Sequence, residues 1–131
     1  MTRQRKVILE ELRKLAEHPT AEELYEIVKQ KLPRISLGTV YRNLEVLSEL
    51  GKIQKIELSG SIMRFDWQTE KHYHIRCINC DRVDNAPIEF MKNMENVLGS
   101  TDYKITGHRL EFLGLCPVCM EKAIERDFLD K

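Results

Sequence analysis

Four cysteines fall in two pairs with the same short spacing. Cys77 and Cys80 enclose two residues, Cys116 and Cys119 enclose two more, and 35 residues separate the pairs. Each Cys-x-x-Cys turn presents two thiolates, and two such turns complete the tetrahedral shell that structural zinc prefers. A thioredoxin-type redox site needs only one such pair, and a zinc deaminase needs an H-x-E motif that this sequence lacks. The sequence therefore predicts a structural Zn²⁺ site with no open position for catalysis.

A second group of residues offers nitrogen and oxygen donors. His72 and His74 are two residues apart, so on a strand their imidazoles lie on the same face. Asp66 lies six residues upstream, and His18 precedes Pro19 in a pattern that is also typical of a loop. Such donors suit Fe²⁺, Mn²⁺ or Zn²⁺ rather than a soft ion. The histidines could complete the cysteine site, but four cysteines already fill a zinc shell, which favours a second metal site.

Composition limits the class of protein. The chain has 131 residues, of which 42% are hydrophobic, enough for one ordinary folded domain or two very small ones. No apolar run approaches the ~20 residues that cross a bilayer, and the N-terminus has no signal-peptide core. We therefore expect a cytoplasmic protein without membrane contact, in which disulfides are disfavoured.

The first half reads as three helices and a hairpin. Helices are expected at residues 3–16, from a capping box at Thr20 to Pro33, and from Ser36 to Gly51. Two β-like runs follow at 52–58 and 61–67, with a turn at Ser59-Gly60. This order predicts a winged helix-turn-helix domain over residues 1–65.

The second half, residues 66–131, reads as a small α+β domain. Strands are expected at 72–77 and 103–113, a helix at 88–98 and a last helix from about Pro117, in the order β-β-α-β-α. A domain of this size cannot bury both sheet faces alone, so dimerisation through the sheet is expected. The fold class is thus α+β, a winged helix-turn-helix followed by a dimerisation domain with a zinc site.

Charge gives weak support for a nucleic-acid partner. Residues 1–62 carry 11 Lys and Arg against 9 Asp and Glu, whereas residues 63–131 carry 10 against 12. In a helix-turn-helix the second helix enters the major groove of double-stranded DNA. The apolar stripe of the helix after Ser36 packs inward, which leaves polar residues for DNA: Ser36, Thr39, Arg42 and Asn43.

The chain resembles the ferric uptake regulator (Fur) family, and more narrowly its peroxide-sensing PerR branch. Four segments in the family's order carry the resemblance: HPTAEELY (18–25), SLGTVYRNLEVLSELG (36–51), RFDWQTEKHYHIRCINC (64–80) and HRLEFLGLCPVC (108–119). The resemblance implies a homodimeric repressor on an operator, with Tyr41 against a thymine methyl. It also implies a regulatory ion, Fe²⁺ or Mn²⁺, bound by His18, Asp66, His72 and His74.

Three features of the resemblance favour the peroxide-sensing branch. Asp66 stands where iron-sensing members usually carry Glu, and Lys71, Tyr73 and Leu115 stand where many of them carry ligands of a further site. In that branch Fe²⁺ reacts with hydrogen peroxide and a ligand histidine, here His18 or His72, is oxidised. The repressor is then expected to leave DNA on metal loss or on this oxidation.

Two departures from the family pattern leave alternatives open. The family's fifth ligand is a carboxylate at the position of Asn85, and Asp84 beside it would point to the opposite face of a strand unless a bulge intervenes. Either Asp84 or Asn85 is thus the candidate for a fifth ligand. The chain also lacks the extra N-terminal helix of the family, so some phosphate contacts are expected to be missing. A zinc- or manganese-responsive family member is one alternative. A small metalloenzyme is another, disfavoured because no nucleophile or general base accompanies the His and Asp ligands.

Overall fold

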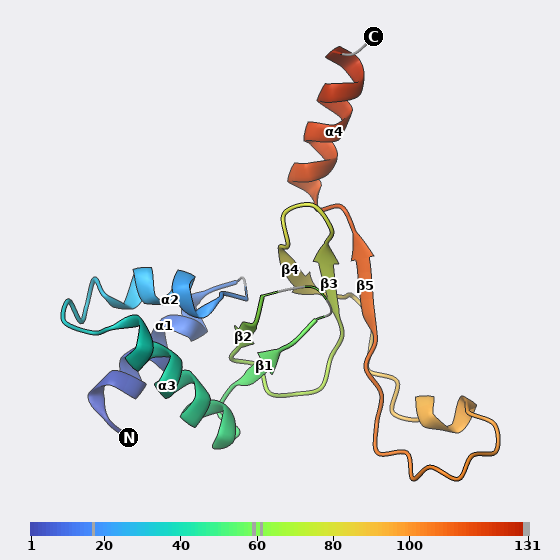
Figure 1. Ribbon diagram of the computed structural model, residues 1–131, viewed down its shortest axis with the longest axis horizontal. Coiled ribbons are helices and arrows are strands. Elements are labelled where there is room, and N and C mark those ends of the chain that lie inside the picture. The colour runs from blue at the N-terminus through green and yellow to red at the C-terminus, as the bar shows by residue number, and fades with distance from the viewer. Residues whose placement is uncertain (17, 59, 61, 130–131) are drawn as a thin grey trace. The chain divides into compact units, whose positions relative to one another are not determined.

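The computed structural model describes residues 1–16, 18–58, 60 and 62–129. The chain divides into two compact units, Met1–Glu70 and Lys71–Lys131, which contain the elements labelled in Figure 1. Among the described residues, no helix has the length and apolar character needed to cross a membrane.

Three capped helices form most of the first unit: α1 (Arg3–Lys14), α2 (Ala21–Val28) and α3 (Leu37–Glu49). The predicted capping box is present, because the Thr20 side chain and the Glu23 side chain each accept a backbone N–H from the other residue. The Ser36 hydroxyl likewise caps α3 by accepting from the Thr39 N–H. Gly51, with φ of 71°, follows α3 in the left-handed conformation expected at a helix end. Two helices are shorter than predicted. Helix α1 ends at residue 14 instead of 16, and α2 ends at Val28 instead of continuing to Pro33.

A hairpin completes the first unit and confirms the predicted winged helix-turn-helix. Strands β1 (Gln54–Ile56) and β2 (Arg64–Asp66) pair antiparallel, with Gln54 opposite Asp66. Both are shorter than predicted, and positions 59 and 61 of the predicted turn and second strand lie outside the described residues. The helices and hairpin share one apolar core, whose most buried members include Ile8, Leu12, Leu24, Val28, Val40, Leu44, Leu47 and Phe65.

The second unit is built on a three-stranded sheet of order β4-β3-β5. Strand β3 (His74–Cys77) pairs antiparallel with β4 (Val83–Asn85) and parallel with β5 (Glu111–Gly114). Helix α4 (Pro117–Leu129) follows β5 and leads away from the sheet, as Figure 1 shows. The last strand therefore has four residues, and three of them, 111–113, fall in the predicted run 103–113.

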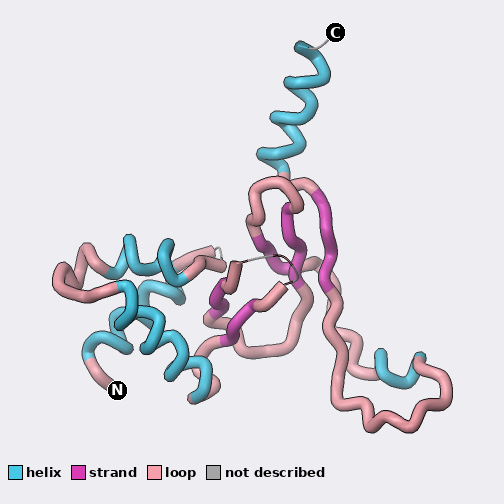
Figure 2. The backbone as a smooth tube through the Cα atoms, viewed as in Figure 1, coloured by secondary structure: helices cyan, strands magenta, loops and turns pink. Residues whose placement is uncertain are grey.

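The helix predicted at residues 88–98 is wrong. The segment forms only the 3₁₀ turn η1 (Met94–Val97), and the remaining path is drawn as loop in Figure 2. The physical reason is a competing side chain, because the Tyr73 hydroxyl accepts the Met91 N–H at 3.1 Å. Phe90 stacks on the His108 ring with centroids 4.9 Å apart, and His108 Nε2 lies 2.5 Å from the same hydroxyl. These contacts hold Phe90 and Met91 against Tyr73 and His108, outside the helix that the apolar period predicts.

Candidate metal centres

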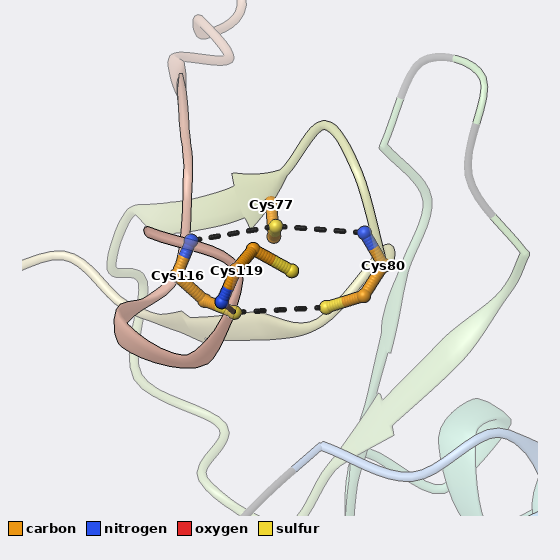
Figure 3. A group of neighbouring side chains, drawn as sticks. All are labelled: Cys77, Cys80, Cys116 and Cys119. Atoms are coloured by element: carbon orange, nitrogen blue, oxygen red, sulfur yellow. Dashed lines mark hydrogen bonds between the residues drawn. The ribbon is translucent and has the colours of Figure 1, made fainter. Parts of the chain in front are cut away.

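The four cysteines converge in the second unit, as the sequence predicted. Cys77 ends β3, Cys80 follows in the next turn, Cys116 precedes α4 and Cys119 lies in its first turn. The four sulfur atoms all lie within 4.8 Å of one another. Figure 3 shows the four side chains pointing toward one another. The Sγ atoms of Cys80 and Cys116 lie 3.7 Å apart. A tetrahedral ion with Zn–S bonds of about 2.3 Å requires sulfurs about 3.8 Å apart. The donor set therefore fits zinc.

Backbone amides favour the ionised form of two of these thiols, Cys77 and Cys116. The amides of Cys80 and Cys116 donate to Cys77 Sγ at 3.5 and 3.4 Å, and they lower the pKa of the Cys77 thiol to about 6. The Cys119 amide donates to Cys116 Sγ and lowers the pKa of that thiol as well. At Cys80 the backbone of Arg82 acts in the same direction, but desolvation and the other thiols outweigh it and raise the pKa to about 11. A cation in the middle removes this conflict, since it stabilises all four thiolates together.

In the first unit, His18 and Asp66 form a buried pair. His18 Nε2 lies 3.7 Å from Asp66 Oδ2, and the two residues are only 6% and 1% exposed. Two hydrogen bonds between the neighbouring segments hold this pair in place. Phe65 N–H donates to Pro19 O at 2.9 Å, and the Arg64 side chain donates through Nη1 to His18 O at 2.8 Å. Asp66 Oδ1 accepts from the backbone of Gln68, which leaves the other oxygen toward the imidazole.

In the second unit, His72 and His74 lie together where β3 begins. Their ring centroids are 4.5 Å apart, and His74 is buried. Tyr73 between them packs against Phe90 and His108, so it holds the strand from the opposite side. The side-by-side arrangement that the period of two predicted is thus present.

The strand register distinguishes the two candidates for a further ligand. Asn85 is the partner of His74 in the β3–β4 ladder, so both side chains lie on one face of the sheet. Asp84 pairs with Ile75 and lies on the other face, where its carboxylate accepts from Arg82 Nε at 2.8 Å. Of the two candidates, Asn85 therefore shares the sheet face of His74 and Asp84 does not.

Helix α3 presents most, but not all, of the residues predicted to face DNA. Ser36, Tyr41 and Arg42 are exposed and Thr39 is half-buried. Asn43 is different, because it is only 6% exposed and its side chain is used inside the unit. Its Oδ1 accepts from Arg5 Nε at 3.0 Å, and its Nδ2 donates to Thr39 O at 2.9 Å. The sequence pattern missed this because the bonding partner lies 38 residues away on another helix.

Comparison with known proteins agrees with this architecture. The profile of the ferric uptake regulator family matches residues 1–113. The peroxide-responsive repressor PerR of Staphylococcus epidermidis is 35% identical over 123 residues, which cover 93% of this chain and 82% of the relative. These relatives are repressors and regulators by name, which supports a regulator over the metalloenzyme alternative.

Solved structures give the same result. The ferric uptake regulator Fur of Helicobacter pylori, described with three functional metal-binding sites, aligns with a TM-score of 0.77 and 26% identity. That alignment covers 92% of this chain and 81% of the other. The Campylobacter jejuni peroxide stress regulator aligns with a TM-score of 0.69 and 28% identity, covering 88% of each chain. On the family profile and the curated relative together, the chain belongs to the ferric uptake regulator family.

Proposed function

We propose that this protein is a metal-dependent transcriptional repressor that binds operator DNA as a homodimer in the cytoplasm. The observation that carries the proposal is the division of donor residues between the two compact units. His18 and Asp66 form a pair in the first unit, and His72 and His74 form a pair in the second. One divalent ion bound by all four side chains would tie the winged-helix unit to the sheet unit.

Two ions have separate roles in this proposal. Cys77, Cys80, Cys116 and Cys119 hold a structural Zn²⁺ that braces the sheet. The nitrogen and oxygen donors bind a regulatory Fe²⁺ or Mn²⁺, both of which accept such ligands. Because occupancy of the regulatory site changes the affinity for DNA, DNA must change the affinity for the ion by the same factor.

The DNA contacts are proposed on the exposed face of α3. Arg42 offers a guanidinium to a guanine edge, and Tyr41 offers apolar contact to a thymine methyl. Ser36 and Thr39 are placed to meet phosphates near the start of the helix, where backbone N–H groups also favour anions. Dimerisation is supported by apolar side chains exposed on the second unit, among them Leu113, Val97, Tyr103 and Ile124.

Release from DNA follows from loss of the regulatory ion or from damage to its ligands. A ferrous ion held by these residues would activate hydrogen peroxide, so that one peroxide oxygen is added to the imidazole of His18 or His72 and the other leaves as water. An oxidised imidazole is a poorer donor, so the two units would no longer be held together.

The test is operator binding with defined metals. A binding sequence is selected from random duplex DNA with Mn²⁺-loaded protein, and fluorescence anisotropy then measures its affinity with Mn²⁺, Fe²⁺ or chelator. We expect binding only with metal, loss of binding for His74→Ala, and wild-type binding for the exposed-site control Glu121→Gln. Binding that is equally tight in chelator, or unchanged in His74→Ala, would refute the proposal.

The peroxide step has its own readout. Fe²⁺-loaded protein exposed to hydrogen peroxide is expected to leave DNA and to gain one oxygen on His18 or His72, detected by peptide mass spectrometry. Mn²⁺-loaded protein is the control and should stay bound without added oxygen. Fe²⁺-loaded protein that stays bound with both histidines intact would reject peroxide sensing.

A second candidate function is a zinc- or manganese-responsive repressor of the same family. The observation in its favour is Asn85, whose neutral amide shares the sheet face of His74. With an amide there, one fewer negative charge is available to hold a divalent ion. Competition between Zn²⁺, Mn²⁺ and Fe²⁺ at the non-cysteine site decides between the two, and a preference for Zn²⁺ over Fe²⁺ would sink the iron-based function.

A further inference from the structure

We propose that Glu111 is a ligand of the regulatory ion, in addition to the four residues named above. The inference rests on the proposed function, because it assigns a further donor to the same site. It is drawn from the parallel pairing of β3 with β5, which joins residues 37 positions apart in the sequence.

The register places Glu111 next to His74. The two residues are direct partners in the β3–β5 ladder, and partners in a ladder project to the same face of the sheet. His74 therefore has Asn85 on one side and Glu111 on the other. Of these two neighbours, only Glu111 carries a carboxylate.

The distances between strands suit a shared ion. Neighbouring strands lie about 4.8 Å apart, and an ion binds imidazole and carboxylate donors at about 2.0–2.2 Å. Side chains that start from adjacent ladder positions on one face can therefore converge on a single ion. Glutamate has three side-chain torsions, so its carboxylate can turn toward a cation that enters beside His74.

Charge supplies the driving force. Three neutral imidazoles and the Asp66 carboxylate would leave a divalent ion with a net positive charge in a partly buried site, which is unfavourable. A second carboxylate makes the site neutral. Asp84 cannot provide it, because that side chain lies on the other face and binds Arg82.

Arg76 follows His74 by two residues, so it shares this face of the sheet, and its Nη1 lies 3.5 Å from Asp81 Oδ1. Glu111 itself is half-buried, so a charge there is partly shielded from water and its attraction to an ion is stronger than at a fully exposed position.

The test measures binding of Mn²⁺ and Co²⁺ to the zinc-loaded, full-length chain. A chromophoric chelator reports the Mn²⁺ affinity, and the visible spectrum of bound Co²⁺ reports the ligand set. We expect Glu111→Gln to weaken Mn²⁺ binding by about tenfold or more and to change the Co²⁺ spectrum. The double variant Glu111→Gln with Asn85→Asp should regain affinity, because a carboxylate returns to the other side of His74. The exposed-carboxylate control Glu121→Gln should match the wild type.

Failure of the inference can be told apart from failure of the proposed function. If His74→Ala abolishes Mn²⁺ binding while Glu111→Gln keeps wild-type affinity and spectrum, Glu111 is not a ligand and the regulatory site stands. If His74→Ala also binds Mn²⁺ like the wild type, the regulatory site itself is refuted. Zinc content of one ion per protomer verifies that each variant is folded. If Glu111→Gln loses zinc, Glu111→Asp is measured in its place. We expect Glu111→Asp to bind Mn²⁺ more weakly than the wild type, and unchanged binding would overturn the inference.

Discussion

The hydrogen bonds of Asn43 give a prediction whose size follows from the structure. Asn43→Ala removes an acceptor from the charged Arg5 Nε and a donor to Thr39 O. A hydrogen bond to a charged group contributes roughly 1.5–3 kcal/mol and a neutral one roughly 0.5–1.5 kcal/mol. Arg5 is half-buried and regains water when its partner is lost, so the lower end of each range applies. We expect the free energy of unfolding of the first unit to fall by about 2 kcal/mol.

Urea unfolding of the zinc-loaded protein, followed by fluorescence of Trp67, measures this change. Trp67 is the one tryptophan of the chain and belongs to the first unit. A double-mutant cycle with Arg5→Ala should give a coupling of about 1.5 kcal/mol. The neighbouring exposed residue is the control, and Arg42→Ala should change stability by less than about 0.5 kcal/mol. Additive effects of the Asn43 and Arg5 substitutions would refute the bond and return Asn43 to the DNA-facing set.

Three further predictions address the other parts of the molecule. Cys116→Ser should lose zinc and should lose the hydrogen-exchange protection of β3 and β5, while α1–α3 stay protected. The matched control Val118→Ala should keep both the zinc and the protection of the strands. Strands that stay protected without zinc would contradict this prediction. Tyr73→Phe leaves the Met91 amide without its acceptor and should speed hydrogen exchange across residues 88–98, and unchanged exchange there would argue against the tether. The ammonium group of Lys31 and its neighbour Lys14 lower the pKa of Glu11, so the stabilisation is complete above the ordinary carboxyl range and is lost as pH falls from that range through the lowered pKa. Glu11→Gln should therefore cost less than about 1 kcal/mol at pH 7 in urea unfolding and progressively less on acidification, and a cost that grows as the pH falls would reverse the sign.

Local signals in the sequence predicted the helices of the first unit well. Thr20 and Glu23 form the capping box that their spacing indicates, and Ser36 caps the third helix, because these bonds join residues only three apart. The segment at 88–98 has a helical apolar period as well, yet it is not a helix. There a long-range bond from Tyr73 decides the structure, and no local pattern contains that partner.

The candidate sites divide in the same way. The cysteine pairs and the His72–His74 spacing are local, and the structure brings each group together. The neighbours of His74 depend instead on the register of three strands, which the sequence does not specify. Glu111 could have been found from sequence only by knowing that β5 runs parallel to β3 and where the ladder starts.

We infer that the cysteine site fixes that register when its ion is bound. Cys77 is the last residue of β3 and pairs with Gly114 of β5, and Cys116 follows two residues later with its amide on Cys77 Sγ. A structural ion held by the four cysteines would therefore clamp both strands at one end, while His74 and Glu111 pair three residues away along the same ladder. A slip of one residue would turn Glu111 to the opposite face, so the clamp sets which donors surround the second ion.

Removal of zinc from the wild-type protein tests this coupling. Zinc is stripped with a thiol-reactive reagent, which modifies no histidine or carboxylate, and Mn²⁺ affinity is measured before and after. We expect Mn²⁺ binding to be lost together with zinc, because the donors at the start of β3 and β5 lose their alignment. Mn²⁺ binding that persists at full affinity would mean that the register holds without the cysteine-bound ion, and that the two metal sites act independently.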